Sequence, residues 1–193
     1  MKTYNILKTF FIVALLINLV SCSNDITPTP NGYGVVTGST PMDLQSGTIV
    51  DHGNVSILTD STSTTSPTIL IYSMVTNFLS NGVTFDPSTN QLTGAGHRLS
   101  IQFNSPEDHH IAPGTYVFSN RTDIFTFKGG FIQDSDDFTQ TSQLRNITSG
   151  TIRVNTQDEV NYDIIFDCVL NTGDTVIGTY NGLVMVYSDK VNN

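Results

Sequence analysis

Apolar side chains recur at every second position along much of the chain beyond about residue 33. The alternation is strictest in Leu99 to Phe103, Tyr116 to Phe118 and Tyr162 to Leu170. A period of two is typical of a half-buried β-strand. Further runs rich in β-branched and aromatic residues, which also favour strands, lie at 55–59, 68–75, 123–127, 151–154 and 175–187.

Turn signals separate these runs at short intervals. Examples are Asn81-Gly82, Pro113-Gly114 and the segment Asn171 to Asp174, which predicts a tight hairpin with Gly173 at positive φ. No stretch shows twelve or more residues of clean helical period, although Met74 to Ser80 could hold one or two helical turns. The pattern predicts one antiparallel β-sandwich of about 8–10 strands over residues 33–193, with a small, calycin-like β-barrel as the alternative.

The N-terminal segment has a different character. Lys2 and Lys8 precede an apolar run, Phe10 to Val20, that is too short to cross a bilayer as a helix. The run ends in Leu19-Val20-Ser21-Cys22, which resembles the lipobox of bacterial lipoproteins. The resemblance implies that residues 1–21 are a cleaved signal peptide and that Cys22 carries a diacylglycerol, with a further acyl chain such as palmitate on its amine. Two or more chains give stable anchoring.

Residues 22–32 are then the lipidated cysteine and a flexible tether. Their alternating Thr and Pro favour an extended polyproline II conformation. We expect the protein to be held at the outer membrane, facing either the cell surface or the periplasm. In the resembling group, several acidic residues after the lipidated cysteine direct a protein to the surface, whereas here only Asp25 lies in that position.

A second resemblance concerns the folded part. The turn-and-strand segments Gly114 to Phe118, Phe125 to Gly129 and Gly178 to Gly182 are similar to those of small β-rich envelope lipoproteins of the Bacteroidetes. This resemblance implies a fold and carries no activity. Proteins of that group are O-glycosylated at Asp-Ser or Asp-Thr followed by an aliphatic residue, Met or Thr, which makes Ser61 and Thr175 candidate glycosylation sites.

Charge and cysteine content exclude some functions. The chain has 8 basic and 17 acidic residues; without Lys2 and Lys8 the mature chain has 6 basic residues and a net charge of −11. Such a surface repels nucleic acid, so we expect no nucleic-acid partner. Cys168 alternates with apolar residues, which predicts a buried strand position rather than a nucleophile.

Acidic and histidine-containing loops offer the only candidate metal ligands. Carboxylate-rich loops suit Ca²⁺, but no defined spacing such as an EF-hand loop is present. The sequence indicates no other cofactor. The candidate metal ligands are Asp108, His109, His110, Asp134, Asp136 and Asp137.

No catalytic constellation emerges from the sequence. There is no Gly-x-Ser-x-Gly elbow, and the two glutamates, Glu107 and Glu159, lie in expected loops. The pattern favours a non-catalytic envelope module that binds a glycan or a protein partner. The alternative is a hydrolase-type enzyme whose dispersed Asp and His residues meet only in the fold.

Overall fold

The computed structural model describes residues 34–38, 40–58, 69–138, 143–156 and 158–188. They form twelve strands and no helix, which confirms the prediction of an all-β domain. The strands are β1 (Gly34–Thr37), β2 (Thr40–Met42), β3 (Leu44–Leu58), β4 (Ile69–Ser80), β5 (Val83–Asp86), β6 (Gln91–Gly94), β7 (Gly96–Ser105), β8 (Gly114–Phe118), β9 (Thr126–Ser135), β10 (Leu144–Thr156), β11 (Asn161–Leu170) and β12 (Thr175–Ser188).

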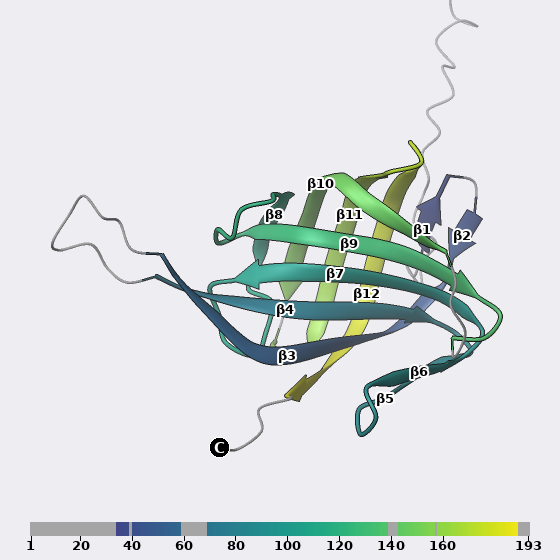
Figure 1. Cartoon of the computed structure of the whole chain (residues 1–193), viewed down its shortest axis with the longest axis horizontal. Helices are drawn as coiled ribbons and strands as arrows, with labels where there is room; N and C mark the ends of the chain where they lie inside the picture. The colour runs from purple at the N-terminus through teal and green to yellow at the C-terminus, as the bar shows by residue number, and fades with distance from the viewer. Residues whose placement is uncertain (1–33, 39, 59–68, 139–142, 157, 189–193) are drawn as a thin grey trace, which may run out of the picture.

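Ten of these strands form one large sheet that folds into two layers. The strand order is β11-β10-β8-β9-β7-β4-β3-β12-β1-β2, with additional pairings of β11 with β12 and of β10 with β9. Figure 1 shows β3, β4, β7 and β9 in one layer and β8, β10, β11 and β12 behind it, with the two sets of strands running in different directions. The layers are joined by hydrogen-bonded strands on both sides, through β3–β12 and through β9–β10.

Most pairings are antiparallel, as predicted, but β3–β12 and β8–β9 are parallel. Period-two alternation is the same in both kinds of pairing, so the sequence pattern could not distinguish them. The remaining two strands, β5 and β6, form a separate antiparallel ribbon. In Figure 1 this ribbon lies beside the ends of β3, β4 and β7.

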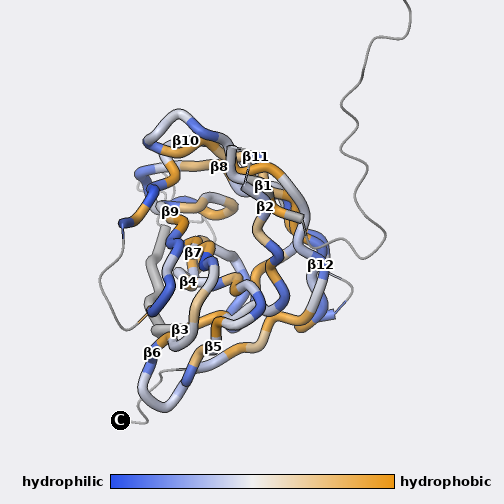
Figure 2. The backbone as a smooth tube through the Cα atoms, turned by 90° about the vertical axis from the view of Figure 1, so that its right-hand side faces the viewer, coloured by the Kyte–Doolittle hydropathy of each residue, from blue (hydrophilic) through white to orange (hydrophobic). Residues whose placement is uncertain are grey.

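The core fills the space between the layers. Phe78 of β4 contacts Phe166 of β11 and Tyr180 of β12 with ring-centroid distances of 5.3 and 4.9 Å. Buried aromatic pairs of this kind add about 0.5–1.5 kcal/mol beyond the area that they bury. Hydrophobic and hydrophilic segments alternate along the strands in Figure 2, as expected where each strand directs every second side chain inward.

Two local predictions were wrong. Met74 to Ser80 belongs to the twelve-residue strand β4 and holds no helical turn, because its pairing with β3 and β7 decides its conformation. The predicted run 123–127 becomes a strand only at Thr126. Phe125 adopts a φ of 55° in a turn, and its amide donates to Asn104 O at 3.1 Å.

The predicted hairpin between β11 and β12 is confirmed. Gly173 has a φ of +89°, which a residue without a Cβ adopts at little cost. The amide of Leu170 donates to Asp174 O at 2.8 Å, and the amide of Gly173 donates to Leu170 O at 3.0 Å. The hairpin therefore sets the register in which Phe166 faces Gly178 across the pair.

Candidate functional site

The outward face of β7 carries an unbroken row of polar side chains. Leu99, Ile101 and Phe103 point inward and are fully buried, and the positions on the other face are Arg98, Ser100, Gln102 and Asn104. Side chains on neighbouring strands share a face when their residues pair in register. Asn77 of β4 pairs with Ser100, and Gln133 of β9 pairs with Arg98. We call Asn77, Arg98, Ser100, Gln102, Asn104 and Gln133 the outer polar face.

This face is withdrawn from solvent although it lies outside the core. Asn77 and Ser100 are each 3% exposed, and Asn104 is fully buried. A solvated strand face usually carries exposed, long charged side chains. Buried amides and hydroxyls on the outside of a sheet indicate a hollowed surface instead.

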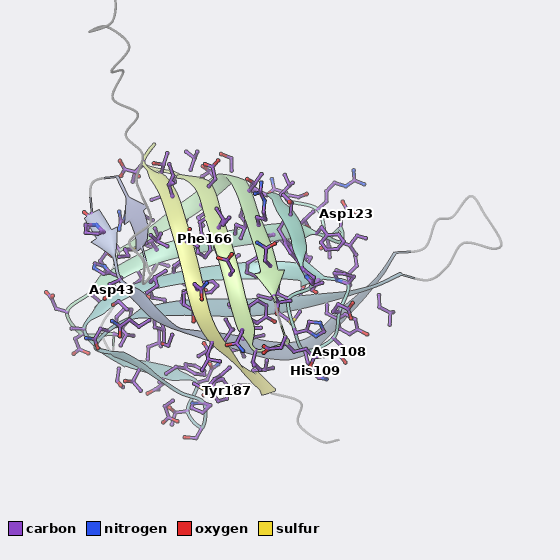
Figure 3. All side chains as sticks on the ribbon, turned by 180° about the vertical axis from the view of Figure 1, so that it is seen from behind. Asp43, Asp108, His109, Asp123, Phe166 and Tyr187 are labelled. Carbon is purple, nitrogen blue, oxygen red and sulfur yellow. The ribbon has the colours of Figure 1, made fainter. Side chains whose placement is uncertain are left out.

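Two hollows lie on this side of the sheet. The first, which we call the hairpin groove, has a volume of about 380 Å³ and lies where the β5–β6 ribbon meets the ends of β4, β7 and β9. Phe85 of the ribbon contacts Tyr187 near the end of β12, the position that Figure 3 labels, with a ring-centroid distance of 5.5 Å. The groove is lined by Asn77, Phe85, Asn90, Gln91, Leu92, Arg98, Gln133 and Phe138.

The second hollow, of about 340 Å³, lies further along β7 and is more apolar. Phe131 lines it, and the guanidinium of Arg98, which lines the hairpin groove, lies 4.9 Å from the centroid of the Phe131 ring. The two hollows therefore meet at this cation–π contact. The second hollow is lined by Val75, Ser100, Gln102, Phe118, Lys128, Gly129, Gly130, Phe131, Asn146 and Ile147.

Arg98 is held in a fixed position at the hairpin groove. Its Nε and Nη2 both donate to Asn77 Oδ1, at 2.9 and 2.8 Å. Burial lowers the pKa of Arg98 from 12.5 to about 10, so the side chain stays cationic at neutral pH. Among the ion pairs formed within the described residues, none joins a carboxylate to Arg98.

A polar ladder occupies the other end of the face. Ser73 donates to Asn104 Oδ1 at 2.6 Å, and Asn104 Nδ2 donates to Thr126 Oγ1 at 2.9 Å. These contacts cross three neighbouring strands, β4, β7 and β9. Since Asn104 is satisfied by its neighbours, it supports the sheet, and the groups available to a ligand lie nearer Arg98.

The predicted metal ligands form two separate clusters. His109 Nε2 lies 3.2 Å from Asp108 Oδ2, and Figure 3 shows the two side chains next to each other. His110 Nδ1 lies 3.1 Å from the backbone oxygen of Asp108. Asp134 instead contacts His97 and Arg145 across the sheet.

Asp136 is exposed and Asp137 is half-buried, its amide donating to Ser135 Oγ at 3.1 Å. Within the described part of the chain, no group of three or more His, Cys, Asp or Glu residues could hold a metal ion. The fold therefore brings no set of candidate ligands together around one point, and the metal site stays a prediction.

His97 and Asp134 form a pair that the sequence analysis missed. His97 Nδ1 lies 2.7 Å from Asp134 Oδ1, and Arg145 bonds the other carboxylate oxygen. In a catalytic triad such a pair also needs a hydroxyl or thiol nucleophile on the imidazole. In the described segments, no hydroxyl or thiol bonds the His97 ring, and Ser80 Oγ accepts from the His97 backbone amide instead. Together with Arg145, the pair links β7, β9 and β10.

Cys168 is fully buried, as predicted. Burial raises the pKa of its thiol from 9.0 to about 12. Only the thiolate is an effective nucleophile, so a buried thiol with a raised pKa is poorly suited to nucleophilic chemistry at neutral pH.

The modification sites predicted from resemblance are placed only in part. Thr175 is exposed at the start of β12, where a glycan would be accessible. Ser61 and Cys22 lie outside the described residues. Across the residues that are described, no helix has the length and apolar character needed for a bilayer crossing.

Comparisons of this chain with protein-family models, with curated proteins and with solved structures gave no match.

The residues of the hairpin groove were not predicted from the sequence. One signal was present: the outward positions of the β7 run read Arg98, Ser100, Gln102 and Asn104, with no Lys or Glu among them. That composition is unusual for a solvated strand face, which commonly carries long charged side chains. No sequence pattern around Asn77 indicates that it lines the groove, because only the register of β4 with β7 places its side chain beside Arg98.

Proposed function

We propose that this chain is a non-catalytic, envelope-anchored lipoprotein whose sandwich-like domain binds a saccharide in the hairpin groove. The observation that carries the proposal is the fixed Arg98–Asn77 pair in a groove of about 380 Å³, which is otherwise lined by amides, phenyl rings and Leu92. Ligand sites in proteins commonly have volumes of about 300–1,000 Å³, with a few placed polar groups.

The chemistry of the lining suits a sugar. Hydroxyl groups both donate and accept hydrogen bonds, and so do the amides of Asn90, Gln91 and Gln133. A sugar ring also has C–H faces that pack on aromatic rings, for which the groove offers Phe85 and Phe138. The chain has no Trp, and these phenyl rings supply the flat apolar surface that the groove offers.

Arg98 and Asn77, at the centre of the groove, are held in place before any ligand arrives. Asn77 is 3% exposed, and Arg98 is held by two hydrogen bonds and by the Phe131 ring. Ordering a mobile side chain on binding costs about 0.5–1.5 kcal/mol. A groove whose central cation is already fixed avoids that cost and can discriminate between stereoisomers.

The anchor completes the proposal. The lipobox at Leu19–Cys22 would hold the domain at the outer membrane through Cys22, and residues 23–32 would separate it from the lipid. Replacing Cys22 with Ala should move the protein from the membrane fraction to the soluble fraction. Protease treatment of intact cells then shows on which side of the outer membrane the domain lies. Loss of the protein from intact cells places it on the cell surface, and loss only after lysis places it in the periplasm.

The binding function is tested by calorimetry of the full chain against a panel of neutral and acidic oligosaccharides. Gln91 is exposed on β6 and lines the groove, so Gln91→Ala removes a ligand contact without affecting the core. The loss of one hydrogen bond, worth about 0.5–1.5 kcal/mol, predicts an affinity roughly two- to tenfold lower. Asn155→Ala is the matched control, because this exposed amide lies on β10 in the other layer. The proposal fails if no saccharide binds at millimolar concentration, or if the two variants behave alike.

A further inference from the structure

The electrostatic state of Arg98 distinguishes it from the other arginines described. Arg145 is paired with Asp134, Arg121 lies 3.8 Å from Asp123, and Arg153 is exposed to solvent. Arg98 is half-buried, and no ion pair within the described residues neutralises it. Cations withdrawn from water are normally paired, because burying an uncompensated charge destabilises a fold.

We propose that the hairpin groove takes a saccharide that carries a single carboxylate, as a uronic acid does, and that this carboxylate binds the guanidinium of Arg98. The inference rests on the proposed saccharide-binding function and names the class of its ligand. The carboxylate of the ligand supplies the negative charge that no described residue provides to Arg98.

The hydrogen bonds of Arg98 define which edge of the guanidinium is left for the ligand. Asn77 Oδ1 occupies Nε and one N–H of Nη2. A guanidinium has five N–H donors, so both donors of Nη1 and the second donor of Nη2 are not used by Asn77. The Nη1–Nη2 edge presents two parallel N–H groups, which match the two oxygens of a carboxylate.

The wider charge of the protein selects against more highly charged ligands. The chain has a net charge of −9, and Asp86 lies directly after the groove residue Phe85. The Asp86 carboxylate accepts hydrogen bonds from Ser88 and Thr89, which hold its pKa below the usual value, so it is ionised at neutral pH. A ligand with one carboxylate gains the contact with Arg98 with the least repulsion, whereas a sugar phosphate or polyanion meets more.

The decisive experiment compares three matched ligands on the full chain by calorimetry. They are a disaccharide ending in glucuronate, the methyl ester of that disaccharide, and its neutral glucose counterpart. The acid should bind about tenfold to a hundredfold more tightly than the ester, as expected for a charge-assisted bidentate contact. This comparison uses the unaltered protein and so does not depend on whether any variant folds.

Two substitutions connect the preference to Arg98. Arg98→Gln should bring the affinities for acid and ester together, and Arg98→Lys should keep only part of the preference, because an ammonium lacks the planar fork. Arg153→Gln on β10 is the matched control and should leave the preference unchanged.

The outcomes separate this inference from the proposed function. Equal binding of acid, ester and neutral sugar would overturn the carboxylate assignment and leave saccharide binding intact. The corresponding sugar phosphate is titrated as a fourth ligand, and its tighter binding would overturn the carboxylate assignment in favour of a phosphate. The absence of binding by all of these ligands at millimolar concentration would overturn both.

Discussion

Adjacent glycines on β9 provide a direct test of which side of the sheet is packed. A Cβ built on Gly130 would lie 2.7 Å from Ile101 Cδ1, 2.7 Å from Ser100 O and 2.9 Å from Ile147 Cδ1. Real Cβ atoms essentially never approach other atoms this closely, and the Ser100 oxygen is backbone that cannot rotate away. A Cβ built on Gly129 would meet nothing within 4 Å.

Gly130→Ala should therefore strain the interior, at a cost of about 1–3 kcal/mol, the usual range for overpacking. Gly129→Ala should be neutral or stabilise the fold by up to about 1 kcal/mol, because Ala reduces the freedom of the unfolded chain. For a domain of this size, about 2–4 °C of melting temperature corresponds to each kcal/mol. The two effects together predict a gap of about 1–4 kcal/mol, so we expect the two variants to melt roughly 2–16 °C apart, with Gly130→Ala lower.

Thermal and urea unfolding of the two full-length variants measures this difference, and circular dichroism confirms that both keep the β fold. Urea slopes that match the unaltered protein would show that the native and unfolded states are otherwise alike. If Gly130→Ala is as stable as Gly129→Ala, then Gly130 does not face the interior and the register of β7 with β9 is wrong.

Three further predictions concern buried polar groups. Ser105 Oγ donates to His110 O and accepts from the amides of Glu107 and Ala112, so Ser105→Ala should lower the free energy of unfolding by about 1–3 kcal/mol in urea melts. Arg98→Met removes an uncompensated charge but leaves Asn77 Oδ1 without its partner, so in a double-mutant cycle the double replacement Asn77→Leu, Arg98→Met should be more stable than Arg98→Met alone. Both variants should lose the preference for acidic over neutral sugars. Burial raises the pKa of the Cys168 thiol to about 12, and the unfolded chain ionises this group near 9.0. The native state then holds the proton that the unfolded state releases, so the melting temperature should fall as the pH rises from 9 towards 12, and a flat profile would contradict this.

Alternation along the chain was sufficient to predict which side chains form the core. Leu99, Ile101 and Phe103 are fully buried, as is Cys168 in the run that also contains Phe166. These positions follow from period two alone, because a strand with one apolar face must bury that face. The strand at Met74 to Ser80 was harder to recognise, since a short apolar run fits either period until pairing decides.

The architecture depended on contacts between distant parts of the chain. The parallel pairing of β3 with β12 joins Gly47 to Val184, and no local pattern indicates that partnership. Phe125 shows the same limit at a smaller scale: its aromatic ring favours a strand, but its hydrogen bond to Asn104 holds it in a turn. Non-local hydrogen bonds therefore determined the features that local propensity did not predict.

The candidate site was less predictable than the core for the same reason. Asn77, Arg98 and Gln133 lie on three different strands, and only the register of β4, β7 and β9 brings them to one groove. The loop residues Asp108 and His109 were predicted as metal ligands because carboxylate and imidazole groups can be recognised from the sequence alone. They contact each other, but they contribute nothing to the groove.

One strand serves both the core and the site, and this explains why the site can hold an unpaired cation. Leu99, Ile101 and Phe103 of β7 are fully buried and fix its backbone between β4 and β9. That rigid backbone holds the outward side chains at constant spacing, so Arg98 stays against Asn77 and Phe131 rather than turning into solvent. A carboxylate from within the chain would have compensated the charge of Arg98, but it would have occupied the Nη1–Nη2 edge of the guanidinium that a ligand needs. If the groove takes an acidic sugar, as proposed above, then leaving Arg98 without an internal carboxylate keeps that edge open for the ligand at some expense in stability.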